Sequence, residues 1–331
     1  MDQVEPLFPP KLRRGDTVRV VAPSSSRAMV MEHDHTDLIE RRFADLGLQL
    51  TYGDHVDERD AVNSSPIASR VADLHAAFSD PHVDAVLTVI GGFSSNELLP
   101  HLEWDLIAAN PKVFCGYSDI TALQNAMLAR TGLVTYSGPH WSSFGMRDHF
   151  EHTLDWFAHA LFEDDPIEVR PAAQWTDDLW FLDQDKRTPE TNSGWWPIRP
   201  GSAEGRLVGG NLCTFNLLQG GDYRPSLDGA ITLVEDDFLT DPPTFARDLA
   251  SLLQLPDAAG IRGVLIGRFQ RSSEMTRDLL EQILARHPQL DALPVLANVD
   301  FGHTSPQLTL PVGGRAELVS GLTSKLRITE H

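Results

Sequence analysis

The first half of the chain alternates apolar runs with amphipathic segments. The runs Thr17–Ala22 and Asp84–Ile90 are almost continuously apolar and end at turn residues, which predicts two buried strands. Apolar residues recur at helical spacing through Asp34–Leu46 and Ile67–Phe78, and Gly47 is a suitable stop for the first of these helices. Buried strands that alternate with helices indicate βαβ units and a mostly parallel sheet.

The alternation continues for one more unit. Lys112–Cys115 and Leu133–Tyr136 read as short strands, and the stretch from Ile120 to Arg130 between them reads as a helix. We therefore expect an α/β protein in which ligands collect beyond the carboxyl ends of the strands.

The pattern changes at about residue 164. Residues 164–204 are rich in Pro, Asp, Thr, Gly and Trp, and no sustained period appears in them. Four of the seven tryptophans lie here: Trp175, Trp180, Trp195 and Trp196. Because linkers seldom carry so many large aromatic residues, this composition favours a functional loop that covers something.

Strand and helix patterns return after residue 205. Strands are expected at Ile231–Val234, Gly263–Ile266 and Pro294–Val299, helices at Pro243–Leu253 and Glu274–Ala285, and a closing hairpin at Ala316–Thr329. We expect an N-terminal α/β domain over residues 1–163, a Trp-rich loop or linker over 164–204, and a C-terminal domain over 205–331.

Composition narrows the class of function. A chain of 331 residues, 41% hydrophobic and 22% charged, is long enough for two globular domains. Its net charge of −20 and its lack of Lys/Arg clusters argue against a nucleic-acid partner. No signal peptide and no apolar run of about 20 residues is visible, so no membrane association is expected. The two cysteines, Cys115 and Cys213, lie in apolar, strand-like surroundings, which fits a reducing, cytoplasmic location.

Ser118 is the first candidate for chemistry. In the stretch FCGYSDIT a short apolar strand runs into Gly116, and a helix begins at about Asp119. A serine at such a strand-to-helix turn exposes its hydroxyl beside backbone N–H groups that can hold an oxyanion. The stretch departs from the G-x-S-x-G elbow at Ile120, and a plain helix cap explains Ser118 equally well from local sequence. Cys115 is a rival nucleophile, although its place within an apolar strand favours a core role.

A glycine pair supplies a second part of the expected site. Gly91 and Gly92 close the strand Asp84–Ile90, where backbone without side chains lets a substrate approach closely. An ordinary turn is the more common use of such a pair.

A serine nucleophile needs a base, and the base needs an orienting acid. Among thirteen histidines, His303 directly follows a strand and precedes a Pro-terminated turn. The run Glu235-Asp236-Asp237 ends another buried strand, and Glu235 lies nearest the sheet, with Asp236 as a rival. The histidine pairs His33/His35 and His149/His152 lack a completing carboxylate or thiolate, so surface positions are expected for them.

Together these segments resemble the LD-carboxypeptidase family, and within it the microcin C self-immunity branch. The matching blocks are GG with NELL at 91–99, GYSDIT at 116–121, GRLVGGNL at 205–212, VED at 234–236, FGHTSP at 301–306 and LPVG at 310–313. They follow the family's order over almost the whole chain.

The resemblance implies a Ser–His–Glu triad of Ser118, His303 and Glu235, and an oxyanion hole from the backbone of Gly92 and Asp119. It also implies a flavodoxin-like N-terminal domain, a β-rich C-terminal α/β domain, a homodimer, and no cofactor or metal.

Two substrate classes fit this chemistry. One is an aminoacyl- or peptidyl-nucleotide such as processed microcin C, whose base could stack on Trp180 or, as second choice, Trp175. Asn211, in the GRLVGGNL block, is a further candidate substrate contact. The alternatives are a murein tetrapeptide, which has no aromatic face to stack, and tryptophans that only pin the loop. A binding protein without chemistry on the same scaffold is the third reading, which the intact triad set disfavours.

Overall fold

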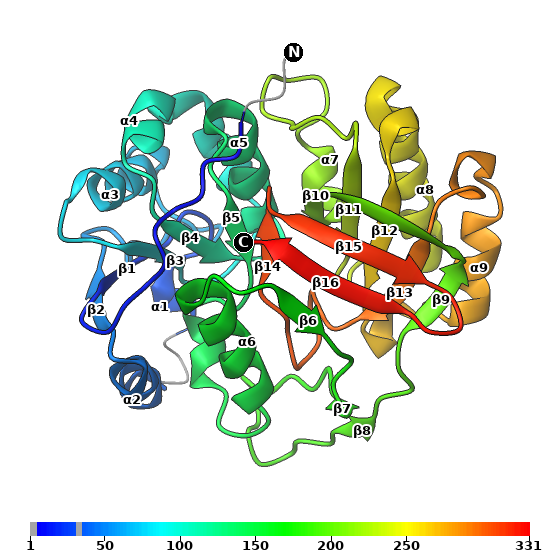
Figure 1. Cartoon of the computed structure of the whole chain (residues 1–331). Coiled ribbons are helices and arrows are strands. Elements are labelled where there is room, and N and C mark those ends of the chain that lie inside the picture. The colour runs from blue at the N-terminus through cyan, green and yellow to red at the C-terminus, as the bar shows by residue number, and fades with distance from the viewer. Residues whose placement is uncertain (1–4, 31–34) are drawn as a thin grey trace.

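The computed structural model describes residues 5–30 and 35–331. Two large sheets lie side by side, one built mainly from the first half of the chain and one from the second (Figure 1). Helices cover the outer faces of both sheets, and the C-terminus lies near the centre of the molecule.

The first sheet has the predicted parallel arrangement. Its order is β14-β5-β4-β3-β1-β2, and all neighbours except β14 run parallel. The strands are β1 Thr17–Val21, β2 Gln49–Tyr52, β3 Ala85–Thr88, β4 Val113–Gly116, β5 Thr135–Ser137 and β14 Leu310–Val312. Apart from β14, the order is that of flavodoxin-like folds, which bind ligands at the carboxyl edge.

Helices connect these strands on both faces of the sheet. They are α1 Arg27–Val30, α2 Thr36–Leu46, α3 Ile67–Ser79, η1 Ser95–His101, α4 Trp104–Ala109, η2 Ser118–Ile120, α5 Thr121–Thr131, η3 Ser142–Gly145 and α6 Glu151–Phe162. The predicted stop at Gly47 is confirmed, because this residue adopts a left-handed conformation and its N–H bonds the last turn of α2.

The second sheet is mixed. Its order is β6-β16-β15-β10-β11-β12-β13-β9, with β10 to β13 parallel and antiparallel strands on both sides. The strands are β6 Ile167–Val169, β9 Trp196–Arg199, β10 Gly201–Asn211, β11 Ala230–Glu235, β12 Gly263–Gly267, β13 Val295–Val299, β15 Arg315–Ser320 and β16 Lys325–Glu330. The expected hairpin at 316–329 is the pair β15 and β16.

The second half also carries short helices. They are α7 Leu212–Asn216, α8 Pro242–Leu253, η4 Pro256–Gly260, η5 Arg271–Ser273, α9 Arg277–Leu284 and η6 Pro288–Leu290. One apolar core runs from the α3–α5 face of the first sheet to the α8–α9 face of the second. This shared core fixes the two sheets relative to each other, so side chains from both can meet at their junction.

Several strands cross the predicted domain limits, among them β9, which pairs with β13, and β10, which spans residues 204/205. β14 comes from the C-terminal part but pairs with β5 of the first sheet, and β6 comes from the Trp-rich segment but pairs with β16. The Trp-rich segment also contains the small ladder of β7 Gln174–Trp175 and β8 Glu190–Thr191. The division at residues 163/164 and 204/205 therefore stays a prediction, while the mixed α/β class is confirmed.

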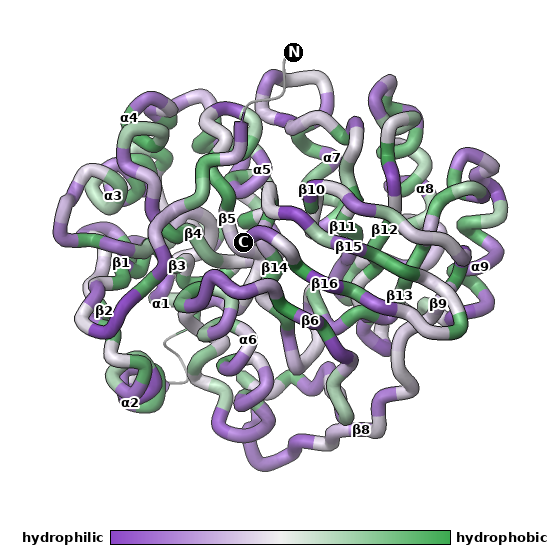
Figure 2. The backbone as a smooth tube through the Cα atoms, in the orientation of Figure 1, coloured by the Kyte–Doolittle hydropathy of each residue, from purple (hydrophilic) through white to green (hydrophobic). Residues whose placement is uncertain are grey.

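Hydropathy follows this architecture. The central strands are largely hydrophobic, whereas the connection around β8 is largely hydrophilic (Figure 2). Within residues 5–30 and 35–331, no helix is long and apolar enough to cross a membrane.

Candidate active site

Ser118 lies where the sheet turns into helix, as its sequence context predicts. It follows β4 directly and opens η2, which continues into α5. Its φ of 61° is in the left-handed region, where a residue with a side chain is strained. The turn brings Ser118 back toward the β3 loop, since a Cβ built on Gly91 would lie 2.9 Å from the Ser118 Cβ and 3.1 Å from its Oγ.

The structure brings the three predicted triad side chains together. The Nε2 of His303 lies 3.0 Å from the Oγ of Ser118, and its Nδ1 lies 2.7 Å from the Oε2 of Glu235. Glu235 ends β11 of the second sheet and His303 lies in the loop after β13, so the chain of contacts spans both sheets. This order of contacts can relay a proton from the hydroxyl to an imidazole held by a carboxylate.

Close packing holds Glu235 in place. Its side chain is 3% exposed, and a Cβ on Gly302 would lie only 2.4 Å from its Oε2. A Cβ on Gly267, at the end of β12, would lie 2.7 Å from the Glu235 Cβ. Both glycines therefore leave room that the carboxylate fills, and Gly302 also has a φ of 97°.

His303 is half-buried and lies close to carboxylates. Burial lowers the pKa of its imidazole, but the charge of Glu235 and their hydrogen bond raise it more, with Asp237 and Asp236 adding to the rise. The net pKa is raised above the usual histidine value. An imidazole with a raised pKa is a stronger base for the Ser118 proton.

The two predicted oxyanion donors belong to the loop after β3 and to the start of η2. Gly92 has a φ of 153°, and a Cβ there would lie 2.4 Å from the hydroxyl oxygens of both Ser24 and Ser25. The amide nitrogen of Asp119 lies 3.4 Å from a Cβ built on Gly91. The glycine loop and the start of η2 thus pack together near Ser118, an arrangement that can present backbone N–H groups to an oxyanion.

Asp236 is not the partner of His303. Its side chain is buried, and its Oδ1 accepts a hydrogen bond of 3.3 Å from the side-chain amide of Asn211. Burial, together with the charge of Glu235, raises the pKa of Asp236 to about 7. The sequence left Asp236 as an alternative to Glu235, and the observed contacts favour Glu235 as the partner of His303.

Asn211 itself lies behind the site. Its side chain is buried, accepts a hydrogen bond of 3.1 Å from the Thr214 N–H and caps α7. It pairs in register with Glu235 across β10 and β11. Asn211 thus lies next to a triad residue, and the substrate contact expected of it stays a prediction.

The cysteines differ from each other. Cys115 is buried in β4, where burial raises the pKa of its thiol and disfavours a nucleophilic thiolate. Cys213 is exposed and lies in α7, so the expectation of strand-like surroundings was wrong for this residue. The strand β10 ends at Asn211, and Cys213 belongs to the helix that follows.

A pair of stacked rings that was not predicted from the sequence, Tyr117 and His140, lies next to His303. Tyr117 stacks on His140 with ring centroids 4.2 Å apart and meets the His303 ring edge-on at 5.1 Å. The Nδ1 of His140 lies 2.9 Å from the Thr88 hydroxyl, and burial holds its pKa well below the usual value. The only sequence signal was that His140 follows the strand ending at Tyr136, so it lies at the same sheet edge.

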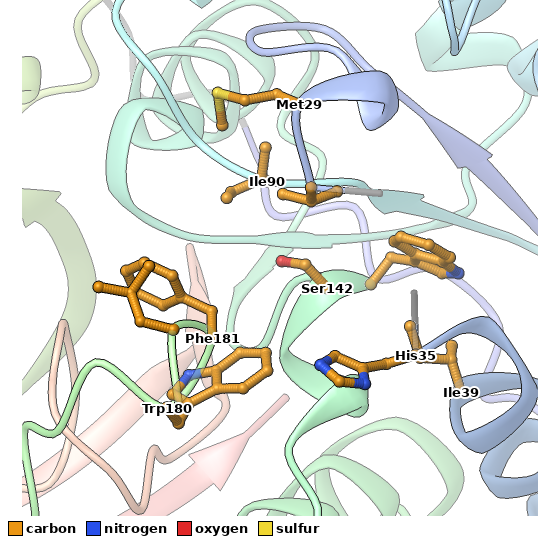
Figure 3. Close-up of a pocket in the computed structure, with 10 residues that line it drawn as sticks. Met29, His35, Ile39, Ile90, Ser142, Trp180 and Phe181 are labelled. Atoms are coloured by element: carbon orange, nitrogen blue, oxygen red, sulfur yellow. The ribbon is translucent and has the colours of Figure 1, made fainter. Parts of the chain in front are cut away.

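A cavity of about 190 Å³ opens at His303. Its lining includes Tyr117, Phe238 and Gln270 from the two sheets and residues 176–181 of the Trp-rich segment. A second cavity of about 380 Å³ adjoins it and shares Ile90, Ser142, Trp180 and Phe181 with it. Figure 3 shows the labelled side chains that line this second cavity, where Trp180 and Phe181 lie opposite Ile90 and Met29.

The two candidate tryptophans have different surroundings. Trp180 lines both cavities. Trp175 instead lies under two guanidinium groups, 4.9 Å from that of Arg268 and 4.5 Å from that of Arg271. It borders a separate hollow behind the His303 loop, so it does not line the cavity at His303. Trp175 fits the alternative reading, in which it pins the segment to the core.

The predicted histidine pairs form no cation site among residues 5–30 and 35–331, where no group of three potential ligands gathers. The Nε2 of His152 accepts a hydrogen bond from the Trp156 indole. His33 lies outside the described residues.

Known protein families and relatives match this chain over most of its length. The model of the LD-carboxypeptidase N-terminal domain matches residues 18–138, and that of the C-terminal domain matches residues 204–318. The putative carboxypeptidase YocD of Bacillus subtilis is 45% identical, over 98% of this chain and 100% of its own length. A probable murein peptide carboxypeptidase of the same organism is 32% identical over 94% and 91%.

The solved structures agree with these matches. An MccF-like protein from Bacillus anthracis has a TM-score of 0.96 and 45% identity, covering 98% of this chain and 100% of its own. The microcin C7 self-immunity protein MccF of Escherichia coli is 29% identical over 95% of this chain and 93% of its own. A structure of MccF in complex with glutamyl sulfamoyl guanosine has a TM-score of 0.89 at 27% identity, with coverage of 98% and 99%.

Proposed function

The chain belongs to the LD-carboxypeptidase family of peptide-bond hydrolases, and from that premise we propose that it cleaves an amide bond in aminoacyl- or peptidyl-nucleotides through an acyl-enzyme on Ser118. The observation that carries the mechanism is the contact chain from Glu235 through His303 to Ser118. The assignment of these three residues as a catalytic triad is part of the proposal.

The reaction proceeds by acyl transfer. His303 takes the proton of Ser118 as the Oγ attacks the carbonyl carbon, and the backbone N–H groups of Gly92 and Asp119 hold the oxyanion. The C–N bond then breaks as His303 returns the proton to the leaving nitrogen. Water, deprotonated by His303, releases the acyl group and restores the hydroxyl of Ser118. Glu235 stabilises the imidazolium in both halves of the reaction, as its effect on the His303 pKa indicates.

The adjoining cavity favours a nucleotide as leaving group. It is largely apolar, and Trp180 joins it directly to the cavity at His303. An indole beside an apolar cavity of this size can stack a nucleobase, worth about 1–3 kcal/mol. The MccF relative has been solved with glutamyl sulfamoyl guanosine and with aspartyl sulfamoyl adenosine, which are ligands of this class.

A murein tetrapeptide is the second candidate substrate. It is favoured by the probable murein peptide carboxypeptidase among the relatives, which covers 94% of the chain. A peptide of this kind has no aromatic face, so the apolar cavity at Trp180 would contribute little to its binding.

A parallel digestion separates the two substrates. Wild-type protein and S118A are incubated with an aminoacyl-sulfamoyl adenosine and, separately, with a murein tetrapeptide, and products are read by mass spectrometry. We expect wild type to release the amino acid from the adenosine compound and S118A to release none. Release of D-alanine from the tetrapeptide alone would overturn the nucleotide assignment. No product from either, with no fluorophosphonate adduct on Ser118, would favour a binding protein without chemistry.

A homodimer in the cytoplasm completes the proposal. It rests on what the family resemblance implies, and light scattering on the purified chain tests the dimer. A mass of one chain would contradict it.

A further inference from the structure

Arg70 is a buried cation in the first turn of α3 that binds three different loops. Its side chain is 3% exposed. Nε donates to the carbonyl of Ser65 at 2.9 Å, and Nη1 donates to the carbonyls of Pro23 at 3.2 Å and Ser94 at 2.9 Å. Nη2 donates to Glu97 Oε2 at 2.6 Å. All three guanidinium nitrogens are engaged, so this one side chain ties together the segments after β1, before α3 and after β3.

Asp119 binds two of the same loops from the opposite side. Its Oδ2 accepts hydrogen bonds from the Ser24 hydroxyl at 2.5 Å and from the backbone N–H groups of Ser94 at 3.0 Å and Ser95 at 2.8 Å. The Ser95 hydroxyl donates to the Asp119 carbonyl at 2.6 Å. Asp119 directly follows the proposed nucleophile, so these bonds couple both loops to the Ser118 turn.

Asp119 and Arg70 both bind Ser94. Its N–H meets the carboxylate of Asp119, while its carbonyl and its hydroxyl, at 3.2 Å, meet the guanidinium of Arg70. Gly92 lies two residues earlier, packed so tightly that a Cβ on it would lie 2.4 Å from the Ser24 hydroxyl oxygen. Gly92 therefore lies in a loop that both charged side chains hold, two residues from the point where they bind it.

We propose that Arg70 is a positioning residue for the oxyanion hole, because it fixes the loops that carry the Gly92 N–H without contacting the substrate itself. The inference rests on the proposed function and deepens it. Catalysis by an oxyanion donor depends on where that N–H points, and a misplacement of about 1 Å can cost a factor of about 100 in rate. Binding of the ground-state substrate depends on it much less.

The expected signature is a loss in kcat without a matching rise in KM. R70Q removes the cation and cannot satisfy Ser65, Pro23, Ser94 and Glu97 together. We expect kcat to fall about 10- to 100-fold with KM within about twofold of wild type. The rate at which a fluorophosphonate labels Ser118 falls in parallel, since this reaction also develops an oxyanion.

Arg224 offers a matched control. It is also mostly buried, binds Asp257 through both Nη atoms at 3.0 Å, and donates to the Pro225 carbonyl at 2.9 Å. It belongs to the segment between α7 and β11, outside the cavities at His303 and Trp180. R224Q should lower the melting temperature by an amount comparable to R70Q and leave kcat and the labelling rate unchanged.

Two further measurements distinguish a loss of positioning from a loss of folding. R70K keeps the charge but lacks the planar fork, so it should fold and show an intermediate kcat. In R70A, added guanidinium ion at low millimolar concentration should restore part of the lost kcat and of the labelling rate, whereas equal sodium chloride should not.

The outcomes separate this proposal from the function beneath it. If S118A is inactive while R70Q and R70K keep wild-type kcat and labelling rate, the positioning role is wrong and the hydrolase assignment stands. If R70Q changes only the melting temperature, as R224Q does, Arg70 is structural. If S118A keeps wild-type activity, the proposed function itself fails.

Discussion

The wall around Ser118 and the segment that covers it are built in opposite ways. In the wall, residues 91–95 and 118–119 pack against each other, and hydrogen bonds from Arg70 and to Asp119 hold them. In the covering segment, residues 176–190, Leu182 is 61% exposed, and Leu179 and Phe181 are also exposed.

The covering segment is held by polar contacts along its length, including hydrogen bonds from Gln184 to the Gly145 carbonyl at 2.8 Å and from Arg187 to the Asp148 carbonyl at 3.0 Å. Thr176 forms a two-residue bridge with Ser305, Asp177 pairs with Arg271, and Asp178 accepts hydrogen bonds from the N–H and hydroxyl of Thr188. Its exposed apolar side chains lie between these polar contacts. Under the proposed function, the wall carries the chemistry and this exposed part of the segment recognises the leaving group.

Apart from changes to Ser118 and His303 themselves, the largest effect is expected at Glu235, which holds His303 beside the wall. E235Q should lower kcat by about 10³- to 10⁴-fold, because the amide no longer holds the imidazolium. Glu235 raises the pKa of His303, so its loss lowers that pKa. The acid limb of the kcat/KM profile, where His303 becomes protonated, should therefore move to lower pH. A pH–rate profile measures this shift, and an unmoved acid limb would contradict the pairing.

Adding a single methyl group at Gly91 should test how tightly the wall is packed. G91A puts a Cβ 2.9 Å from the Ser118 Cβ and displaces the nucleophile, so we expect kcat to fall by about 100-fold. G221A is the control, because a Cβ there meets nothing closer than 3.7 Å. Steady-state kinetics compares them, and equal activity of the two variants would show that the wall tolerates movement.

Within the segment at 174–181, the two tryptophans should separate. W180A should raise KM for an aminoacyl-sulfamoyl adenosine by roughly 10-fold with kcat little changed, since the stacking face is lost. W175A should leave KM unchanged and lower the melting temperature, because it removes a ring between Arg268 and Arg271. An increase of KM in W175A alone would reverse the assignment of the two residues.

The smallest effect concerns Asp236 and depends on pH. Its pKa in the folded chain is about 7, above the usual value near 4, so the folded state holds a proton that the unfolded state releases. The protonated Asp236 therefore contributes fully to the free energy of unfolding of the wild type below pH 4. This contribution is lost as the pH rises to about 7. D236N does not titrate, so its melting temperature relative to wild type should rise by several degrees between pH 4 and 7 and level off above. A difference independent of pH would contradict the raised pKa.

The sequence predicted the regular elements well because their periodicity is local. The strand expected at 84–90 is β3, and the helix expected at 67–78 is α3, each within three residues of its ends. Ser118, Glu235 and His303 could be chosen because each lies at or just after the carboxyl end of a buried strand, where ligands collect, and because the family resemblance groups them. That these strands belong to two different sheets could not be predicted from the local pattern.

The rest depended on contacts between distant segments. β14 is a three-residue strand containing Pro311, too short for a period, and its pairing with β5 crosses the expected domain limit. Trp175 looked like a stacking residue because Arg268 and Arg271 are more than 90 positions away. Arg70 looked like an ordinary polar position of a helix, since nothing local reveals the carbonyls that it binds.

The central claim is that Ser118 and His303 act as one unit, and the kcat of S118A, H303A and the S118A/H303A double variant tests it most directly. The account predicts that each single variant loses on the order of 10⁴- to 10⁶-fold and that the double variant is no slower than the worse of the two, because the second change removes nothing that still works. Losses that multiply in the double variant, or a single variant that keeps wild-type kcat, would contradict it.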